Sequence, residues 1–299
     1  MTADPVRTLL SALTPSRAKV EAYLGDTYVL ETVEHLERLG VDATGFAREH
    51  SLLLLKPDAI VARAVEPTLE WLGDNGFRVV AARRVAVDRH VARALWYYAW
   101  NIASPERRRL ADLLVGISDV LLLVVHAPDG EPPVPVRLTA AKGATDPRKR
   151  RPGELRHLLG RHSYLLNLVH SPDDPADVLR ELAIYFDERE RTGVFEQAAA
   201  RLDRTGEAAV LGHELYATVP ARGFDRADAL TRLCGELGVP EPDSDADCAR
   251  LLETAWSAGR DLDPWSLIVL GSYVFPMRVG TRAQTLRPIS AHDWLEARP

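Results

Sequence analysis

Four short segments of this chain carry the apolar and β-branched residues that favour buried β-strands. They are residues 51–55, 77–87, 119–125 and 164–169. The first and third are continuously apolar, which is typical of strands covered on both faces, whereas the second alternates. Helical spacing of apolar residues separates or follows these segments, at residues 62–75, 91–98, 105–115 and 174–186. The order predicts an α+β fold, a ferredoxin-like α/β sandwich in which a four-stranded antiparallel sheet carries helices on one face.

The chain is long enough for more than this sandwich. Its 299 residues allow two domains or one domain with large additions. Residues 1–48 read as an N-terminal helical extension, residues 49–190 hold the predicted sheet, and residues 191–299 form a mainly helical C-terminal region. The prolines within residues 127–135 are expected to disturb regular structure after the third strand.

Composition excludes several classes of protein. The net charge of −6 and the pI near 5.9 predict no general attraction to nucleic acid or to an anionic membrane. No apolar run approaches the roughly 20 residues that a membrane span needs, and no signal peptide is recognisable. We therefore expect a cytoplasmic protein. Cys234 and Cys248 are expected to be free buried thiols.

One histidine stands where phosphoryl chemistry could take place. His170 follows an apolar strand and precedes the start of a predicted helix, whose free N–H groups favour anions. A neutral imidazole is a good nucleophile and can carry a phosphoryl group as phosphohistidine. The residues alone nevertheless favour an ordinary surface histidine at the end of a strand.

Several segments, taken in order, resemble the nucleoside diphosphate kinases. They are the Lys56-Pro-Asp58 strand end, the Gly143-Ala-Thr145 turn with Arg156 eleven residues after the threonine, and Asn167, His170 and Glu181 at the family's spacing. The resemblance covers roughly residues 51–187. It implies a ping-pong phosphotransferase that moves the γ-phosphoryl group of ATP or another nucleoside triphosphate through phosphohistidine.

The resemblance also implies roles for individual residues. His170 is the nucleophile, and Glu181 orients its ring. Lys56, Thr145 and Arg156 hold phosphates, and Asn167 contacts the sugar hydroxyl. A supporting tyrosine is either Tyr97 or Tyr98, and a further phosphate-binding arginine is Arg137, although its spacing differs by two residues. Mg²⁺ arrives on the nucleotide phosphates, and the chain itself carries no recognisable metal cluster.

The sequence departs from the family around the acceptor. After its histidine the family has Gly-Ser-Asp, whereas this chain has Ser171-Pro172-Asp173, and the stacking phenylalanine is replaced by a charged run at residues 106–110. The acceptor is therefore either a nucleoside diphosphate or a specialised phosphorylated small molecule. The competing hypothesis is a non-catalytic nucleotide-binding or scaffold protein.

Two further expectations concern surfaces. The basic run at residues 148–151 is expected to be a solvated loop, with steering of nucleotides as the functional alternative. The resemblance implies a homo-oligomer, and the additional helices could cover the surfaces through which the family assembles.

Overall fold

The computed structural model describes residues 3–296 and contains one four-stranded antiparallel sheet. Its strands are β1 (His50–Leu55), β2 (Arg78–Val85), β3 (Val120–His126) and β4 (Val169–His170), in the order β2-β3-β1-β4. β1 lies between β3 and β4, with His50 opposite His126 at one end and Leu55 opposite Val169 at the other. This strand order, with helices between the strands, confirms the predicted ferredoxin-like fold.

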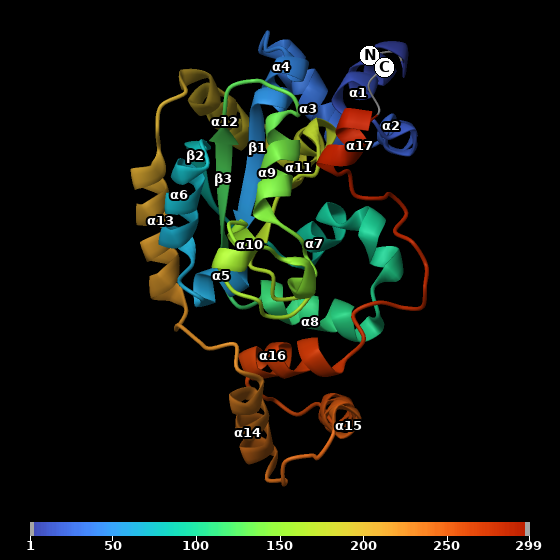
Figure 1. Cartoon of the computed structure of the whole chain (residues 1–299), viewed down its shortest axis with the longest axis vertical. Helices are drawn as coiled ribbons and strands as arrows, with labels where there is room; N and C mark the ends of the chain where they lie inside the picture. The colour runs from blue at the N-terminus through green and yellow to red at the C-terminus, as the bar shows by residue number, and fades with distance from the viewer. Residues whose placement is uncertain (1–2, 297–299) are drawn as a thin grey trace.

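Helices cover both faces of the sheet, not one face as the pattern suggested (Figure 1). On one face Leu53 and Leu55 of β1 share a core with α5 (Pro57–Val61), α6 (Val65–Asp74), α9 (Val134–Lys142) and α13 (Thr205–Thr218). On the other face Leu52 and Leu54 join a core that includes α3 (Thr27–Arg38), α4 (Ala43–Glu49), α11 (Pro175–Tyr185) and α12 (Glu188–Ala200). Every residue of β1 and β3 is buried, so both faces need a cover.

The remaining helices form a hairpin and a C-terminal lobe. The hairpin consists of α7 (Arg89–Leu95), the 3₁₀ helix η1 (Tyr97–Ile102) and α8 (Pro105–Val115). α16 (Pro264–Val274) packs on α8, and α14 (Arg226–Leu237) and α15 (Asp245–Ser257) pack on α16 and project from the body (Figure 1). The chain then runs back along the hairpin to α17 (Ala291–Glu296), near α1 (Ala3–Leu13) and α2 (Arg17–Tyr23).

Two predicted segments differ from the structure. The expected strand at 164–169 is mostly a loop, because Leu168 has a left-handed backbone (φ 63°) and its N–H donates to Asp58 instead of a neighbouring strand. Residues 127–133 are irregular, as the prolines predicted, but α9 already begins at Val134, because Pro135 lies in its first turn, where the missing N–H costs nothing.

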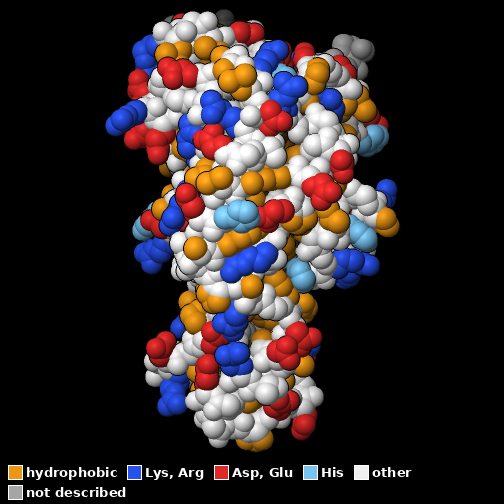
Figure 2. All heavy atoms as spheres, turned by 90° about the vertical axis from the view of Figure 1, so that its left-hand side faces the viewer, with side chains coloured by type: hydrophobic (Ala, Val, Ile, Leu, Met, Phe, Trp, Pro, Cys, Tyr) orange, Lys and Arg blue, Asp and Glu red, His pale blue; other side chains and the backbone are white. Residues whose placement is uncertain are grey.

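The distribution of charged side chains on the surface agrees with the mixed charge of the sequence (Figure 2). Acidic and basic side chains are interspersed on the face that carries α6 and α13 (Figure 2). Within residues 3–296, no helix is both long enough and apolar enough to cross a membrane. Cys234 and Cys248 are free and buried, as predicted.

The contact between α13 and α6 gives a test of how the C-terminal region joins the sheet. A Cβ atom on Gly212 of α13 would lie 2.7 Å from Cγ1 of Val65, whereas one on Gly206 of the same helix meets nothing within 4 Å. Gly212→Ala should therefore lower the free energy of unfolding by about 1–3 kcal/mol through overpacking. Gly206→Ala should be neutral or stabilise by up to about 1 kcal/mol, because alanine favours helix. Urea denaturation of the full chain measures both, and equal effects would contradict this packing.

Candidate phosphotransfer site

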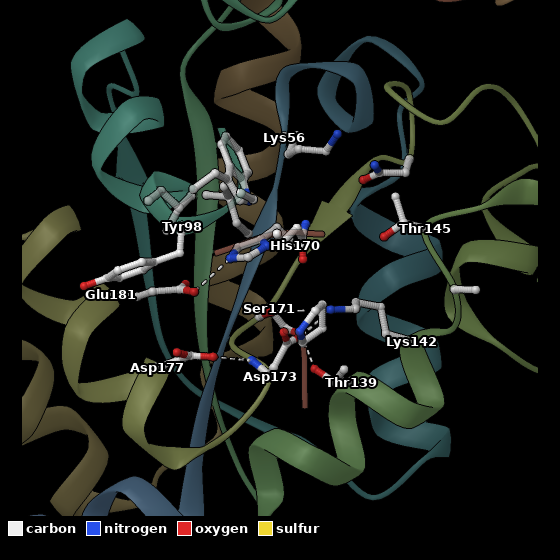
Figure 3. A pocket seen from close by; sticks show the side chains of 18 of the residues that line it. Lys56, Tyr98, Thr139, Lys142, Thr145, His170, Ser171, Asp173, Asp177 and Glu181 are labelled. Atoms are coloured by element: carbon white, nitrogen blue, oxygen red, sulfur yellow. Dashed lines mark hydrogen bonds and ion pairs between the residues drawn. The ribbon is translucent and has the colours of Figure 1, made fainter. Parts of the chain in front are cut away.

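The pairing of β1 with β4 brings the Lys56-Pro57-Asp58 segment close to the segment that contains His170. Leu54 of β1 pairs with His170 of β4, and the N–H of Lys56 donates to the carbonyl of Leu168 at 2.9 Å. Lys56, which directly follows β1, and His170, which ends β4, therefore open into the same cavity (Figure 3). Its volume is about 880 Å³, which is the size of a pocket for a nucleotide or another small molecule.

His170 is oriented by a single carboxylate. Its Nε2 lies 2.9 Å from Oε1 of Glu181, a buried residue of α11. The edge of the Trp96 ring contacts the imidazole, with ring centroids 5.4 Å apart. Among the described residues nothing forms a hydrogen bond with Nδ1. A neutral ring that donates its Nε2 proton to Glu181 keeps a lone pair on Nδ1, so Nδ1 is the atom available for nucleophilic attack.

One carboxylate oxygen of Glu181 is buried without a hydrogen-bond donor among the described residues. Burial raises the pKa of its carboxyl group, and His170 partly opposes this effect. Its second oxygen, Oε2, is buried without a hydrogen-bond partner in the described part of the chain. In the family pattern a serine stands two residues after the histidine, but here that position is Pro172, which has no side-chain donor.

Arg156 links the loops on the opposite side of the cavity. This buried residue of α10 (Leu155–Leu158) donates to the hydroxyl of Thr145 at 3.1 Å and to the amide oxygen of Asn167 at 3.4 Å. It also donates to the carbonyls of Gly143 and Val169. Burial lowers the pKa of Arg156 to about 10, with a further contribution from Arg150. The sequence-predicted set Thr145, Arg156 and Asn167 is thus brought together.

Lys56 lies at the end of β1 with its ammonium in the same cavity. Its Nζ donates to the carbonyl of Leu165 at 3.1 Å and pairs with Asp58 at 3.3 Å. Burial lowers the pKa of Lys56 despite the nearby carboxylate. Because Asp58 also accepts the N–H of Leu168, the Lys56-Pro57-Asp58 segment holds both the cation and the loop that precedes His170.

Three predicted residues are not brought to the histidine. The Tyr97 side chain is 66% exposed. Tyr98 lines the cavity, but its hydroxyl bonds to the carbonyl of Ala22 and its ring packs on Arg180. Arg137 does not line this cavity and donates to the carbonyl of Pro128. The aromatic ring beside His170 is that of Trp96, and the cation on α9 that reaches the cavity is Lys142, not Arg137.

Sequence reasoning also missed the contributions of both terminal regions. Lys19 of the N-terminal extension pairs with Asp174 and Asp177 at 2.9 and 2.8 Å, at the start of α11. Burial by itself lowers the pKa of Lys19, but the two carboxylates outweigh this effect, so that the pKa is raised overall. At the other end, Gln284 and residues 286–292 line the cavity, and Asn101 of the hairpin bonds to the backbone of Ala283 and Thr285 in the same segment. Because these contacts join distant segments, no local pattern could have revealed them.

The basic run at residues 148–151 is not uniformly solvated. Arg150 is only 4% exposed and donates to the carbonyls of Ala144, Thr145 and Gly160. Its side chain therefore stabilises the turn that contains Thr145 by these three hydrogen bonds. Arg148, in contrast, is exposed, and among the described residues its side chain bonds to Asp146 alone. The expectation of a solvated loop is wrong for Arg150, because its guanidinium satisfies carbonyls that the irregular chain leaves without helix or sheet partners.

This difference predicts unequal effects of two alanine substitutions. Arg150→Ala should lower the free energy of unfolding by about 1–3 kcal/mol, because it leaves buried carbonyls without donors. Arg148→Ala should change it by less than about 0.5 kcal/mol, because the residue is a surface ion-pair partner. Chemical denaturation followed by tryptophan fluorescence compares them. If both substitutions changed the free energy of unfolding by a similar amount, the hydrogen bonds of Arg150 would not stabilise the turn as proposed.

Comparisons with known proteins agree with this arrangement. The model of the family described as nucleoside diphosphate kinase matches residues 49–191. The nucleoside diphosphate kinase of Wolinella succinogenes is 32% identical over 142 residues, which are 48% of this chain and 98% of that protein. That of Thermococcus kodakarensis is 29% identical over 140 residues, covering 46% of this chain and 76% of that protein.

Solved structures of the same family also align with part of the chain. One is a halophilic nucleoside diphosphate kinase from Halobacterium salinarum in complex with CDP, with 23% identity and a TM-score of 0.41 over 48% of this chain and 90% of that one. Because the Wolinella succinogenes protein is matched over nearly its whole length, this chain belongs to the nucleoside diphosphate kinase family.

Proposed function

We propose that this protein is a phosphotransferase that works through phosphohistidine at His170. The observation that carries the proposal is the His170–Glu181 hydrogen bond, which leaves Nδ1 unengaged in a cavity lined by the buried cations Lys56 and Arg156. A nucleophile, positive charge for the phosphoryl oxygens and a partly closed cavity are what phosphoryl transfer requires.

The proposed reaction has two steps. The Nδ1 lone pair of His170 attacks the γ-phosphorus of a nucleoside triphosphate, and the bond to the bridging oxygen breaks, so that the nucleoside diphosphate leaves with the electron pair. A phosphate oxygen of the acceptor then attacks phosphohistidine, and the electron pair of the N–P bond returns to Nδ1. Glu181 stabilises the ring while it carries positive charge, through the proton on Nε2.

The phosphates are proposed to replace contacts that Lys56 and Arg156 now make with the protein. Both cations donate to backbone carbonyls at the cavity, and Arg156 can present two N–H groups to one phosphate. Mg²⁺ is proposed to enter on the nucleotide. Within residues 3–296 no cluster of His, Cys, Asp and Glu has the arrangement to hold a metal ion.

We propose that residues 49–190 form the kinase-like domain, and that residues 1–48 and 191–299 are additions that complete its acceptor side. Lys19 and Tyr23 from the first addition and Leu286 to His292 from the second line the cavity. In place of the stacking phenylalanine, the hairpin presents Arg107, whose guanidinium lies 5.2 Å from the ring centre of Tyr164. These differences support an acceptor other than, or in addition to, ordinary nucleoside diphosphates.

A non-catalytic nucleotide-binding role is the second candidate. It is favoured by the buried Oε2 of Glu181, which lacks a partner among the described residues, and by Pro172 at the serine position. A protein that only binds nucleotides could use Lys56 and Arg156, but it would not need the His170 imidazole to be held by Glu181 through Nε2 with Nδ1 left available. This arrangement favours the catalytic proposal.

Labelling with γ-labelled ATP separates the two functions. The wild-type protein should acquire an acid-labile, base-stable phosphoryl group, and His170→Ala should abolish it because the attacking nitrogen is gone. His90→Ala, which removes an exposed histidine of α7, should label like the wild type. Nucleotide binding without label in any variant would leave the binding role as the correct one.

Transfer from the labelled protein tests the acceptor side. Aromatic stacking on a base contributes ~1–3 kcal/mol, and the stacking phenylalanine is absent here. We therefore expect ADP, GDP, CDP and UDP to remove the label from phosphorylated protein with rate constants within about tenfold of one another. Rapid-quench measurement gives these constants. A preference of about a hundredfold or more for one base would contradict the idea of a site without base stacking.

A further inference from the structure

Lys142 is a buried cation on the cavity that the family pattern does not include. It is the last residue of α9 and is only 4% exposed. Its Nζ donates to the hydroxyl of Ser171 at 2.6 Å and lies 3.4 Å from the carbonyl oxygen of the same residue. Ser171 directly follows His170, and the hydroxyl of Thr139 bonds to it as well, at 2.8 Å (Figure 3).

The ammonium of Lys142 differs from the other two buried lysines in having no paired carboxylate. Lys19 pairs with two aspartates, and Lys56 pairs with Asp58. In residues 3–296, no carboxylate oxygen lies within 4 Å of the Lys142 ammonium. A buried charge without a counter-ion is costly, and proteins retain such groups mainly where a ligand supplies the opposite charge.

Charged groups on three neighbouring elements act on this amine. The pKa of Lys142 is lowered to about 7, chiefly by burial and also by Arg156 of α10. Asp173, in the loop after β4, and Glu181 of α11 act in the opposite direction. The ligand-free site therefore holds a lysine that gains its full charge when an anion arrives beside it.

We propose that Lys142 binds the phosphoryl group as it moves to and from His170, with Ser171 and Thr139 holding its ammonium in place. The inference rests on the proposed phosphotransfer function. The phosphoryl group in transit spreads negative charge over three oxygens, and an ammonium fixed beside the residue that follows the nucleophile can neutralise one of them.

The same arrangement explains both departures after His170. Ser171 stands where the family has glycine, and its hydroxyl positions Lys142. Pro172 stands where the family has serine and offers no hydroxyl, so the hydrogen-bonding group has moved by one residue. Arg137, the phosphate-binding arginine that the resemblance implied, lies on the same helix but donates to the carbonyl of Pro128 and does not line the cavity.

Three variants test the role of Lys142 in the full chain. Lys142→Met removes the charge at similar length, Lys142→Arg keeps it, and Lys149→Met removes an exposed lysine from the nearby basic run as the matched control. The measured quantity is the rate of His170 labelling at subsaturating Mg²⁺–ATP between about pH 6 and about pH 9, which reports the titration of the free protein. Circular dichroism and thermal unfolding check the fold.

We expect Lys142→Met to label about a hundredfold more slowly than the wild type, and Lys149→Met to remain within about twofold. The wild-type rate should fall as pH rises through about 7, because Lys142 then loses its charge. Lys142→Arg should lose this decline, because a guanidinium stays protonated over the whole range. A merely structural lysine would not produce the change in pH profile.

The outcomes separate this inference from the function on which it rests. If the wild type labels and the wild-type and Lys142→Arg profiles coincide, Lys142 does not meet the phosphoryl group, although His170 still does. If Lys142→Met fails to fold, the comparison of wild type with Lys142→Arg alone decides the question. If no label enters the wild type, the phosphotransfer function and the role of Lys142 are both overturned.

Discussion

The antiparallel pairing of β1 with β4 is the constraint on which the site depends. β4 is only two residues long, so Leu54 and Leu55 supply its whole strand contact. The left-handed backbone of Leu168 then turns the chain, and Asp58 and Lys56 hold that turn through its N–H and its carbonyl. A left-handed leucine costs on the order of 1–2 kcal/mol, and it persists because both of its backbone groups are bonded. One local arrangement thus places His170 and Lys56 at the same cavity.

Three buried cations line this cavity. Arg156, Lys56 and Lys142 are each at most 6% exposed, and burial lowers the pKa of all three. Without a ligand, Lys56 pairs with Asp58, whereas Arg156 and Lys142 donate to backbone carbonyls and hydroxyl groups, whose dipoles do not cancel the charges of these two residues. A bound polyphosphate would restore the missing counter-charge, and binding to the folded state alone would stabilise the fold.

The sequence predicted what local patterns and motif spacing can encode. The apolar runs identified the three long strands, and the spacing of Asn167, His170 and Glu181 identified residues that meet in space. Prediction from the sequence failed for residues whose contacts come from segments distant along the chain or from irregular loops. Arg150 resembled its neighbours in a charged loop, yet only the folded chain presents the three carbonyls that bury it. Lys142 lay outside the family motif, and only the folded chain shows it buried against Ser171, with no paired carboxylate among the described residues.

Both terminal regions line the cavity that contains His170. Lys19 and Tyr23 bond to Asp177 in the first turn of α11, the helix that also supplies Glu181. The C-terminal segment reaches the same cavity after crossing the hairpin, where the backbone of Thr285 bonds to Tyr98 and Asn101. Neither addition touches Lys56, Thr145 or Arg156 through a hydrogen bond among the described residues. The added chain therefore contributes parts of the cavity lining that form no hydrogen bond with these three residues, and we propose that these parts distinguish the acceptor from the donor.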